Sequence, residues 1–236
     1  MLLFFIRHGD PIYSPDSLTP LGHRQAEALA GRLSLHGLDK LFVSSSRRAR
    51  QTAEPTCRAL RLQATVLDWC NEGHAWEEMT VINKEGYPCW AFLDSRMRQC
   101  FASEEMFLLG KRWYEHPAIQ ATTMKQGFER IQENADTFLE SLGYRHTVNG
   151  YEAIRPNTER VALFAHQGFG LAFLSAVLDI PYPLFSLRFD MGHTGMTVIE
   201  FGAGEGLVIP RVLQLSNDSH IYKEGLETSY QNEILI

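Results

Sequence analysis

The sequence has no excess of basic residues and no long apolar segment. Of its 236 residues, 22 are lysine or arginine and 28 are aspartate or glutamate, so the net charge is −6. A general nucleic-acid-binding protein normally carries a basic excess, so the charge argues against that class. No stretch approaches the length of a membrane span or of the apolar part of a signal peptide. We therefore expect a globular cytoplasmic protein with neither nucleic acid nor membrane as a partner.

Cysteine is scarce as well. The four cysteines at positions 57, 70, 89 and 100 show neither the CxxC pair nor the Cys-His spacing of a metal-binding module. We expect them to be reduced thiols of a cytoplasmic protein. The sequence also contains no internal repeat and no low-complexity tract. These absences favour one α/β domain over residues 1–236.

Short apolar runs alternate with helical patterns in the first seventy residues. The runs at 2–6, 41–43 and 65–67 are typical of buried strands. Thr19 followed by Pro20 predicts a helix start, since threonine caps helices and proline suits the first helical position. A second helix is predicted from Arg47. This alternation indicates βαβ units and a three-layer, doubly wound, mostly parallel sheet with helices on both faces.

The rest of the chain has a less regular hydrophobic pattern. Residues 10–18 are polar and are expected to form a loop, and about 74–156 form a mainly helical insertion over the active-site edge of the sheet. A strand is predicted at 161–165, followed by a helix. A final hairpin is predicted from 196–201 and 207–215. The polar segment at about 216–236 is expected to be a loose tail or a flap.

Two of the predicted strands end in the same way. Residues 7–9 read Arg-His-Gly after the strand at 2–6, and residues 166–168 read His-Gln-Gly after the strand at 161–165. The carboxyl ends of strands in an open α/β sheet are where ligands bind. If these two strands are neighbours, the imidazoles of His8 and His166 lie at one edge. The pattern predicts a reactive site there.

The residues around this site favour an anion over a metal ion. Arg7 and Arg48 would repel a divalent cation, whereas guanidinium groups bind phosphate with paired hydrogen bonds. Residues 44–46 are three serines at the start of a predicted helix, and they supply hydroxyls and N–H donors suited to phosphate. We therefore expect a phosphate site without a metal.

The sequence resembles the histidine phosphatase superfamily, also called phosphoglycerate mutase-like. The resemblance spans nearly the whole chain, although the insertion matches only in size and helical character. The motifs that carry it are Arg-His-Gly at 7–9, Leu-Thr-x-x-Gly-x-x-Gln-Ala at 18–26, Arg-Ala-x-Gln-Thr-Ala at 48–53 with Ser44 before it, and a second histidine at His166.

The resemblance implies a phosphatase that works through a phosphohistidine on His8. Arg7, Arg48 and His166 would bind the phosphoryl group and stabilise the charge of the transition state. The family uses a carboxylic acid after the third strand as general acid and then as general base, and Glu72 is the candidate here. No cofactor is required.

Two further residues are candidates for substrate contact. Gln167 stands where the family commonly has glycine after the second histidine, so its amide could contact the substrate. His193 precedes a predicted strand and could reach the pocket. Among the remaining histidines, His220 is expected to be solvated.

Three other functions remain open from the sequence. A phosphoglycerate mutase would return the phosphoryl group to a second hydroxyl, and it needs extra cations; candidates in the insertion are Lys111, Arg112, Lys125, Arg130 and Arg155. A silent member would bind a phosphorylated ligand without turnover, and a metal-dependent hydrolase would lose activity with a chelator.

The expected partner is a small phosphorylated metabolite. Four aromatic residues of the insertion could line its pocket or pack the insertion's own core: Trp76, Trp90, Phe92 and Trp113. The oligomeric state is open, a homodimer included.

Overall fold

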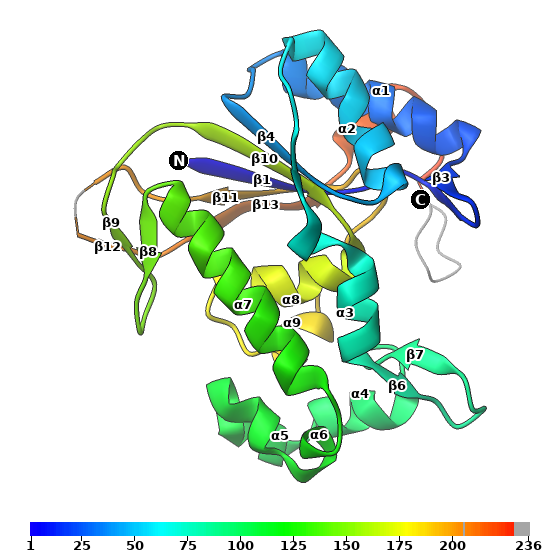
Figure 1. Ribbon diagram of the computed structural model, residues 1–236, viewed down its shortest axis with the longest axis vertical. Helices are drawn as coiled ribbons and strands as arrows, with labels where there is room; N and C mark the ends of the chain where they lie inside the picture. Colours follow the sequence, from blue (N-terminus) through cyan, green and yellow to red (C-terminus); the bar gives the residue numbers. More distant parts are fainter. Residues whose placement is uncertain (205, 229–236) are drawn as a thin grey trace.

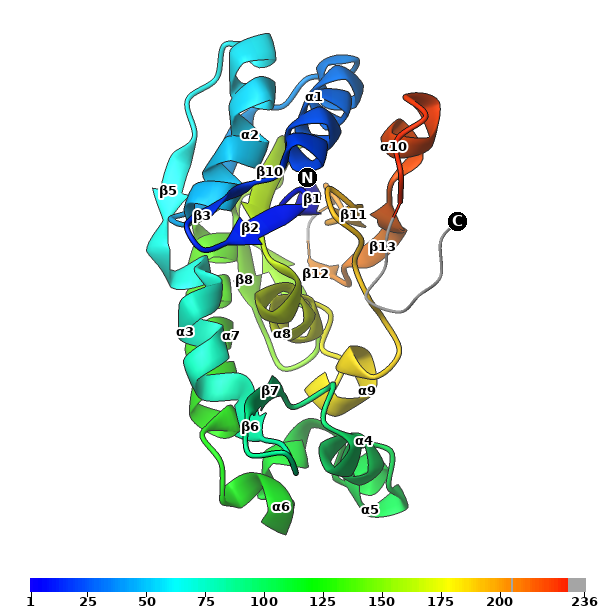
Figure 2. The same ribbon diagram turned by 90° about the vertical axis from the view of Figure 1, so that its right-hand side faces the viewer.

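The computed structural model describes residues 1–204 and 206–228. At its centre is a six-stranded sheet with helices on both faces (Figures 1 and 2). In spatial order the strands are β13 (Arg211–Asn217), β11 (Met196–Glu200), β1 (Leu2–Arg7), β10 (Arg160–Ala165), β4 (Lys40–Ser44) and β5 (Thr65–Leu67). Only β11 runs opposite to the other five. The predicted three-layer, mostly parallel α/β fold is confirmed.

Strand β1 is buried on both faces, as its continuous apolar run predicts. Leu3 and Phe5 belong to the core on one side of the sheet, whereas Phe4 and Ile6 belong to the core on the other. The first core contains α8 (Gln167–Val177) and α9 (Tyr182–Ser186), and the second contains α1 (Pro20–Ser34) and α2 (Arg47–Leu60). Helices on both faces hold the central strands in place.

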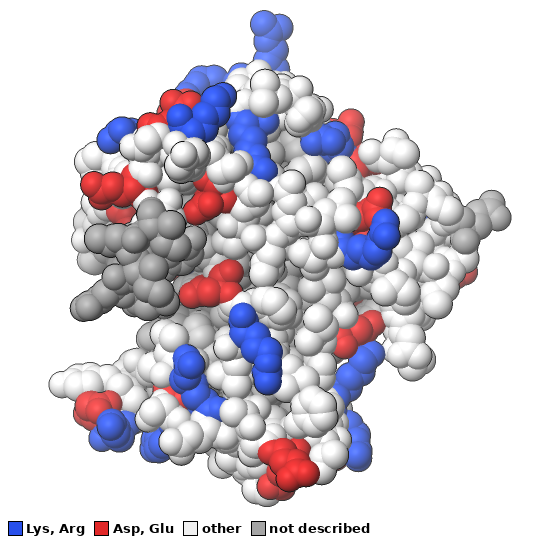
Figure 3. All heavy atoms as spheres, turned by 180° about the vertical axis from the view of Figure 1, so that it is seen from behind, with Lys and Arg blue, Asp and Glu red and all other residues white. Residues whose placement is uncertain are grey.

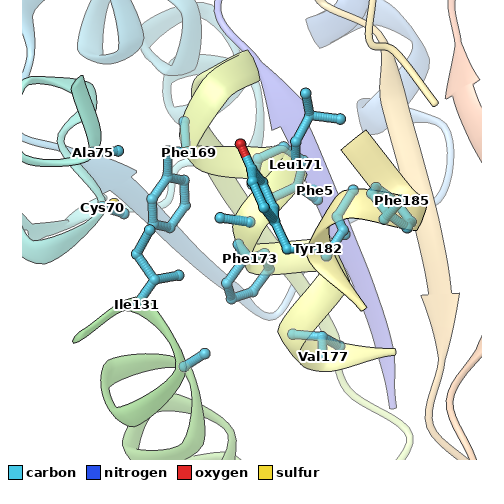
Figure 4. Close-up of a cluster of buried hydrophobic side chains, with 14 of the residues drawn as sticks. Phe5, Cys70, Ala75, Ile131, Phe169, Leu171, Phe173, Val177, Tyr182 and Phe185 are labelled. Carbon is cyan, nitrogen blue, oxygen red and sulfur yellow. The ribbon is translucent and has the colours of Figure 1, made fainter. Parts of the chain in front are cut away.

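Helix α8 packs directly on β1 (Figure 4). The ring of Phe5 stacks on Phe169 and Phe173, with ring centroids 6.4 and 5.5 Å apart. Gly170 permits this approach, because a Cβ atom there would lie 2.5 Å from Cζ of Phe5. The N-terminus of α8 is thereby fixed beside the carboxyl end of β1.

The two helices on the opposite face begin where the sequence predicts. Thr19 caps α1, with its side chain accepting a hydrogen bond from the N–H of Gly22, and Pro20 is the first helical residue. Ser46 caps α2 by accepting from the N–H of Ala49. The serine cap directs the first turn of α2, which carries Arg48, towards the carboxyl edge of the sheet.

The insertion is mainly helical and lies below the sheet in Figure 1. Its helices are α3 (Glu72–Met79), α4 (Ser95–Phe101), α5 (Glu104–Leu109), η2 (Gly110–Glu115), α6 (Pro117–Gln120) and α7 (Met124–Ser141), preceded by the short helix η1 (Asp68–Cys70). Two strand pairs were not predicted: β6 (Thr80–Ile82) with β7 (Pro88–Trp90), and β8 (Tyr144–His146) with β9 (Tyr151–Ala153). Strand β12 (Leu207–Val208) extends the second pair.

Three predictions about connecting segments differ from the structure. The polar loop at 10–18 is a hairpin of β2 (Pro11–Tyr13) and β3 (Asp16–Leu18). The final antiparallel pair is present as β11 and β13, but the segment predicted as its second strand is divided, and β12 joins a different sheet. The described part of the tail is not loose, because α10 (Ser219–Lys223) buries His220 and Ile221 against the fold. His220 is therefore not solvated. Residues 229–236 of the predicted tail lie outside the described part.

The surface carries charges of both signs. On the face drawn in Figure 3, basic and acidic side chains are interspersed and form no broad field of one sign. None of the described helices has the length and apolar character needed to cross a membrane.

Gly22 is predicted to be essential for stability, because the first turn of α1 touches the segment after β1. A Cβ atom on Gly22 would lie 2.2 Å from the carbonyl oxygen of Asp10. We expect Gly22→Ala to lower the free energy of unfolding by about 1–3 kcal/mol. Gly31→Ala is the matched control, since its Cβ would meet nothing within 4 Å in the same helix; it should be neutral or stabilising. Urea denaturation compares the two, and equal stabilities would contradict this account of the contact.

Candidate active site

His8 and His166 lie next to each other at the carboxyl edge of the sheet. Strands β1 and β10 are parallel neighbours, and their register pairs Arg7 with Ala165. The residues that follow, His8 and His166, have ring centroids 5.2 Å apart. The register therefore brings together the two histidines that the sequence patterns singled out.

The His8 ring is held in one orientation by its own neighbour. Its Nδ1 lies 2.7 Å from the carbonyl oxygen of Gly9, so Nδ1 carries the hydrogen and donates it. Burial lowers the pKa of the His8 imidazole well below 6.5, and the nearby positive groups lower it further. The ring is consequently neutral at pH 7, with the lone pair on Nε2 available as a nucleophile.

His166 is held by serine hydroxyls. Its Nε2 lies 2.8 Å from Oγ of Ser44 and 3.3 Å from Oγ of Ser46. When these hydroxyls donate to Nε2, Nδ1 carries the hydrogen and faces Oε2 of Glu72 at 3.6 Å. Burial lowers the pKa of His166 well below its usual value, and Arg48 adds to this shift. Ser44, predicted as a phosphate contact, lies in a position to orient His166.

Arg7 is a buried cation beside the two rings. Its side chain is fixed by donation from Nη1 to the carbonyl oxygen of Met191. Burial lowers the pKa of Arg7, whereas the nearby Glu72 carboxylate raises it. A buried guanidinium without a carboxylate in contact is costly in free energy, so this position favours an anionic ligand.

Arg48 joins α2 to two carboxylates. Nη1 donates to Oδ1 of Asp16 at 2.9 Å, and Nη2 donates to Oε2 of Glu72 at 3.1 Å. The ring of Tyr13 stands over the guanidinium, 5.3 Å from centroid to Cζ. Two acidic partners and an aromatic ring hold this cation at the rim of the site.

Glu72 is the first residue of α3, and Asn71 caps this helix. The Oε1 atom of Glu72 accepts a hydrogen bond from the N–H of Gly168 at 2.8 Å. That bond ties the carboxylate to the first turn of α8, next to His166. Gly168 is in turn covered by Trp90, whose ring would lie 2.4 Å from an added Cβ. The Glu72 carboxylate is thus close to His166, and Trp90 covers the glycine that holds it.

His193 and Gln167 occupy different positions around the site. The ring of His193 lies 5.9 Å from that of His8, and burial lowers the pKa of His193 to about 3, helped by Arg7. His193 is therefore neutral at pH 7 and lies beside His8. The side chain of Gln167 is buried and donates a hydrogen bond from Nε2 to Oδ1 of Asp190.

The sequence reasoning missed three residues that shape the site. Asp16, in the segment predicted as a polar loop, accepts hydrogen bonds from the N–H of Arg47 and from the Arg48 side chain. Tyr13 covers Arg48. The hydroxyl of Thr52 accepts from the N–H of Gly9 at 3.0 Å and so fixes the turn after His8. Thr52 lies in the Arg-Ala-x-Gln-Thr-Ala motif at 48–53, which could have signalled its role; nothing in the sequence marks the other two.

The site holds hydrogen-bond donors that no described residue accepts. Nε of Arg7, Nε of Arg48 and Nδ1 of His166 are buried and make no hydrogen bond within the described residues. Phosphate oxygens would satisfy donors of this kind. His8, Glu72 and His166 also offer ligand atoms within 4.8 Å of one another, the spacing of a metal site. The adjacent guanidinium groups favour the anion.

Comparison with known proteins agrees with this geometry. Residues 3–108 match the family model of the histidine phosphatase superfamily (branch 1). "Putative phosphoserine phosphatase 2" of Hydrogenobacter thermophilus is 25% identical over 178 residues, covering 72% of this chain and 80% of that protein. Mycobacterial glucosyl-3-phosphoglycerate phosphatase has a TM-score of 0.58 at 19% identity, covering 91% of this chain and 98% of that one. A phosphoserine phosphatase of Entamoeba histolytica, solved with phosphoserine, has a TM-score of 0.59 at 16% identity, covering 93% and 98%.

Proposed function

The chain belongs to the histidine phosphatase superfamily, and on this premise we propose that it hydrolyses a small phosphomonoester, without a metal ion, through a phosphohistidine on His8. One observation carries the proposal. The neutral imidazole of His8 donates from Nδ1 to Gly9 and is surrounded by buried N–H donors of Arg7, Arg48 and His166. This arrangement suits attack by Nε2 on a phosphorus atom whose oxygens bind those donors.

The first step transfers the phosphoryl group to the protein. Nε2 of His8 forms a bond to phosphorus while the bond from phosphorus to the leaving oxygen breaks. Arg7, Arg48 and His166 hold the three phosphoryl oxygens and stabilise their charge. Glu72, as a carboxylic acid, gives the leaving oxygen a proton. The alcohol then departs.

The second step returns the protein to its starting state. Glu72, now a carboxylate, accepts a proton from water, and the water oxygen forms a bond to phosphorus. The bond from phosphorus to Nε2 of His8 breaks, which releases inorganic phosphate and the neutral imidazole. The hydrogen bond from the N–H of Gly168 and the nearness of His166 Nδ1, 3.6 Å from Oε2, support both roles for Glu72.

The mutase alternative is less well supported. Four of the insertion's candidate cations have carboxylate partners elsewhere: Lys111 with Asp179, Arg112 with Glu115, Lys125 with Glu129 and Arg130 with Glu78. The fifth, Arg155, donates to the carbonyl oxygen of Ser141. These cations are engaged in contacts outside the site, whereas a mutase needs free positive charge to retain a bisphosphorylated intermediate.

Two substrates and a chelator test the proposal. We expect the purified protein to release phosphate from p-nitrophenyl phosphate, with unchanged rates in excess EDTA. With 3-phosphoglycerate the readout is the 2-phospho isomer, which should not accumulate. Loss of phosphate release from p-nitrophenyl phosphate in EDTA would favour a metal-dependent hydrolase. Accumulation of the isomer would favour the mutase, and absence of any turnover would favour a silent binding member.

Trp90 is predicted to favour substrates with an apolar leaving group. Its ring lies against Gly168 and meets Trp76 edge-on, with centroids 5.1 Å apart, on the side of the site that holds Glu72. Because the leaving group departs towards the general acid, this aromatic pair would contact it. We expect Trp90→Leu to lower kcat/KM about tenfold for p-nitrophenyl phosphate, mainly through KM.

A second substrate provides the control for Trp90→Leu. Phosphoserine has a small polar leaving group, so its kcat/KM should change much less in the same variant. The ratio of the two values within one protein removes any effect of partial unfolding. An equal loss for both substrates would show that Trp90 supports the fold of the site and does not select the leaving group.

A further inference from the structure

A large cavity lies away from His8, between α1, α10 and the sheet. It measures about 960 Å³ and its lining includes residues of β1, β11 and β13. Helices α1 and α10 lie side by side above these strands (Figure 2). Neither His8 nor any other residue of the candidate active site lines it. A space of this size can hold a small organic molecule.

The floor of the cavity is apolar. Phe4 of β1 and Met196 and Val198 of β11 line it from the sheet, and Leu33 lines it from α1. Gly31 on α1 faces open space, because a Cβ atom there would meet nothing within 4 Å. Such a floor suits a ring or another flat apolar group.

Cations without carboxylate partners surround the floor. Arg24, Arg32, Arg160 and Lys223 line the cavity, and none of them forms an ion pair within the described residues. Arg160 lies over the ring of Phe4, 5.0 Å from centroid to Cζ. Two carboxylates also line the cavity, Glu27 and Glu224, and Glu27 is paired with Arg58. Among the described residues, Arg32 donates hydrogen bonds to neutral oxygens of Asn217 and Gln214, and the carboxylate of Asp218 is near without forming an ion pair. The lining thus carries four cations against two carboxylates, and this local excess of positive charge in a chain with a net charge of −6 favours an anionic ligand.

His220 adds a hydrogen-bond acceptor to the cavity wall. Its side chain is 3% exposed, and Nε2 lies 2.9 Å from Oγ1 of Thr194. That hydroxyl donates to the carbonyl oxygen of His193, so it accepts from Nε2 of His220. Nδ1 of His220 then carries a lone pair, and it has no partner among the described residues. A ligand with an N–H or O–H group would satisfy it.

We propose that this cavity is a second ligand site for a small organic anion with an apolar ring and an N–H or O–H donor. The apolar floor takes the ring, the unpaired cations take the anionic group, and Nδ1 of His220 takes the donor. The site is coupled by contact to the catalytic edge, because the N–H of Thr194 donates to the carbonyl oxygen of His8 at 3.2 Å.

The probe is 8-anilinonaphthalene-1-sulfonate, which combines naphthalene, a sulfonate and an anilino N–H. We expect saturable binding of one molecule per chain by fluorescence, unchanged by saturating orthovanadate, which occupies a phosphate site. Gly31→Trp fills the cavity and should weaken binding at least about tenfold. The matched control is Ser34→Trp, an exposed position of the same helix outside the lining, and it should bind as the wild type does.

The double variant Arg24→Gln, Lys223→Gln tests the electrostatic part. It should weaken binding about fivefold or more and reduce the dependence of affinity on salt. The proposal is overturned if binding does not saturate, if orthovanadate displaces the probe, or if Gly31→Trp binds it as tightly as Ser34→Trp does. Unchanged affinity in the double variant would overturn the assignment of an anion as the ligand.

Discussion

Replacing His8 with alanine is expected to abolish phosphate release, with a loss of about a thousandfold or more in kcat. The reason is structural. The hydrogen bond from Nδ1 to Gly9 leaves Nε2 of His8 as a buried, neutral nucleophile, and its nearest ring neighbours are His166 and His193. Both of these have pKa values lowered by burial, but neither has its ring fixed in the same way by a backbone carbonyl.

His36→Ala serves as the control for the His8 variant, because His36 is exposed on the surface and far along the chain from the motif at 7–9. Phosphate release from p-nitrophenyl phosphate is measured for both variants together with their thermal unfolding. Turnover by a folded His8→Ala protein at the wild-type rate would rule out the covalent mechanism altogether.

Replacing Glu72 with glutamine is expected to lower kcat about 10²–10⁴-fold for an alkyl phosphate such as phosphoserine. Glutamine preserves the size of the side chain and can still accept from the N–H of Gly168, but it cannot transfer a proton. Nitrophenolate needs no proton to depart, so p-nitrophenyl phosphate should still phosphorylate His8. Its product should then appear as a burst of one equivalent per protein, since the second step lacks its general base.

The matched control for this variant is Glu77→Gln, which changes an exposed carboxylate of the same helix. It should leave both substrates unaffected. If Glu72→Gln lowers turnover of both substrates equally and without a burst, the residue holds Arg48 in place and does not transfer a proton.

The strands and helix starts that position His8 and His166 could be predicted, because each depends on residues that are close together in the sequence. The apolar runs before these residues are buried strands, and buried strands of an α/β fold end at one edge. The helix starts at Thr19 and Ser46 follow from side-chain capping, which depends on residues within one turn. Arg48 lies in such a first turn, so its approach to the edge was also predictable.

The contacts that orient these groups could not be predicted. Asp16 reaches Arg48 only because residues 11–18 form a hairpin, and no hydrophobic alternation marks these short strands. Gly22 is required by its distance from the Asp10 carbonyl, which depends on how α1 returns to the sheet. His220 is buried by packing of the polar tail on α1, a tertiary contact that overrides its polar sequence environment. Pattern identifies the elements, whereas packing between distant elements decides these roles.

The most direct test of the covalent mechanism on His8 is to trap the phosphorylated protein. The Glu72→Gln protein is mixed with p-nitrophenyl phosphate, quenched at alkaline pH to preserve phosphohistidine, digested, and analysed by mass spectrometry. The covalent mechanism predicts one added phosphoryl group on the peptide that contains His8, attached at Nε2, and none in the corresponding His8→Ala protein. Turnover with the phosphoryl group on another residue, or with no labelled peptide under conditions that preserve phosphohistidine, would contradict it.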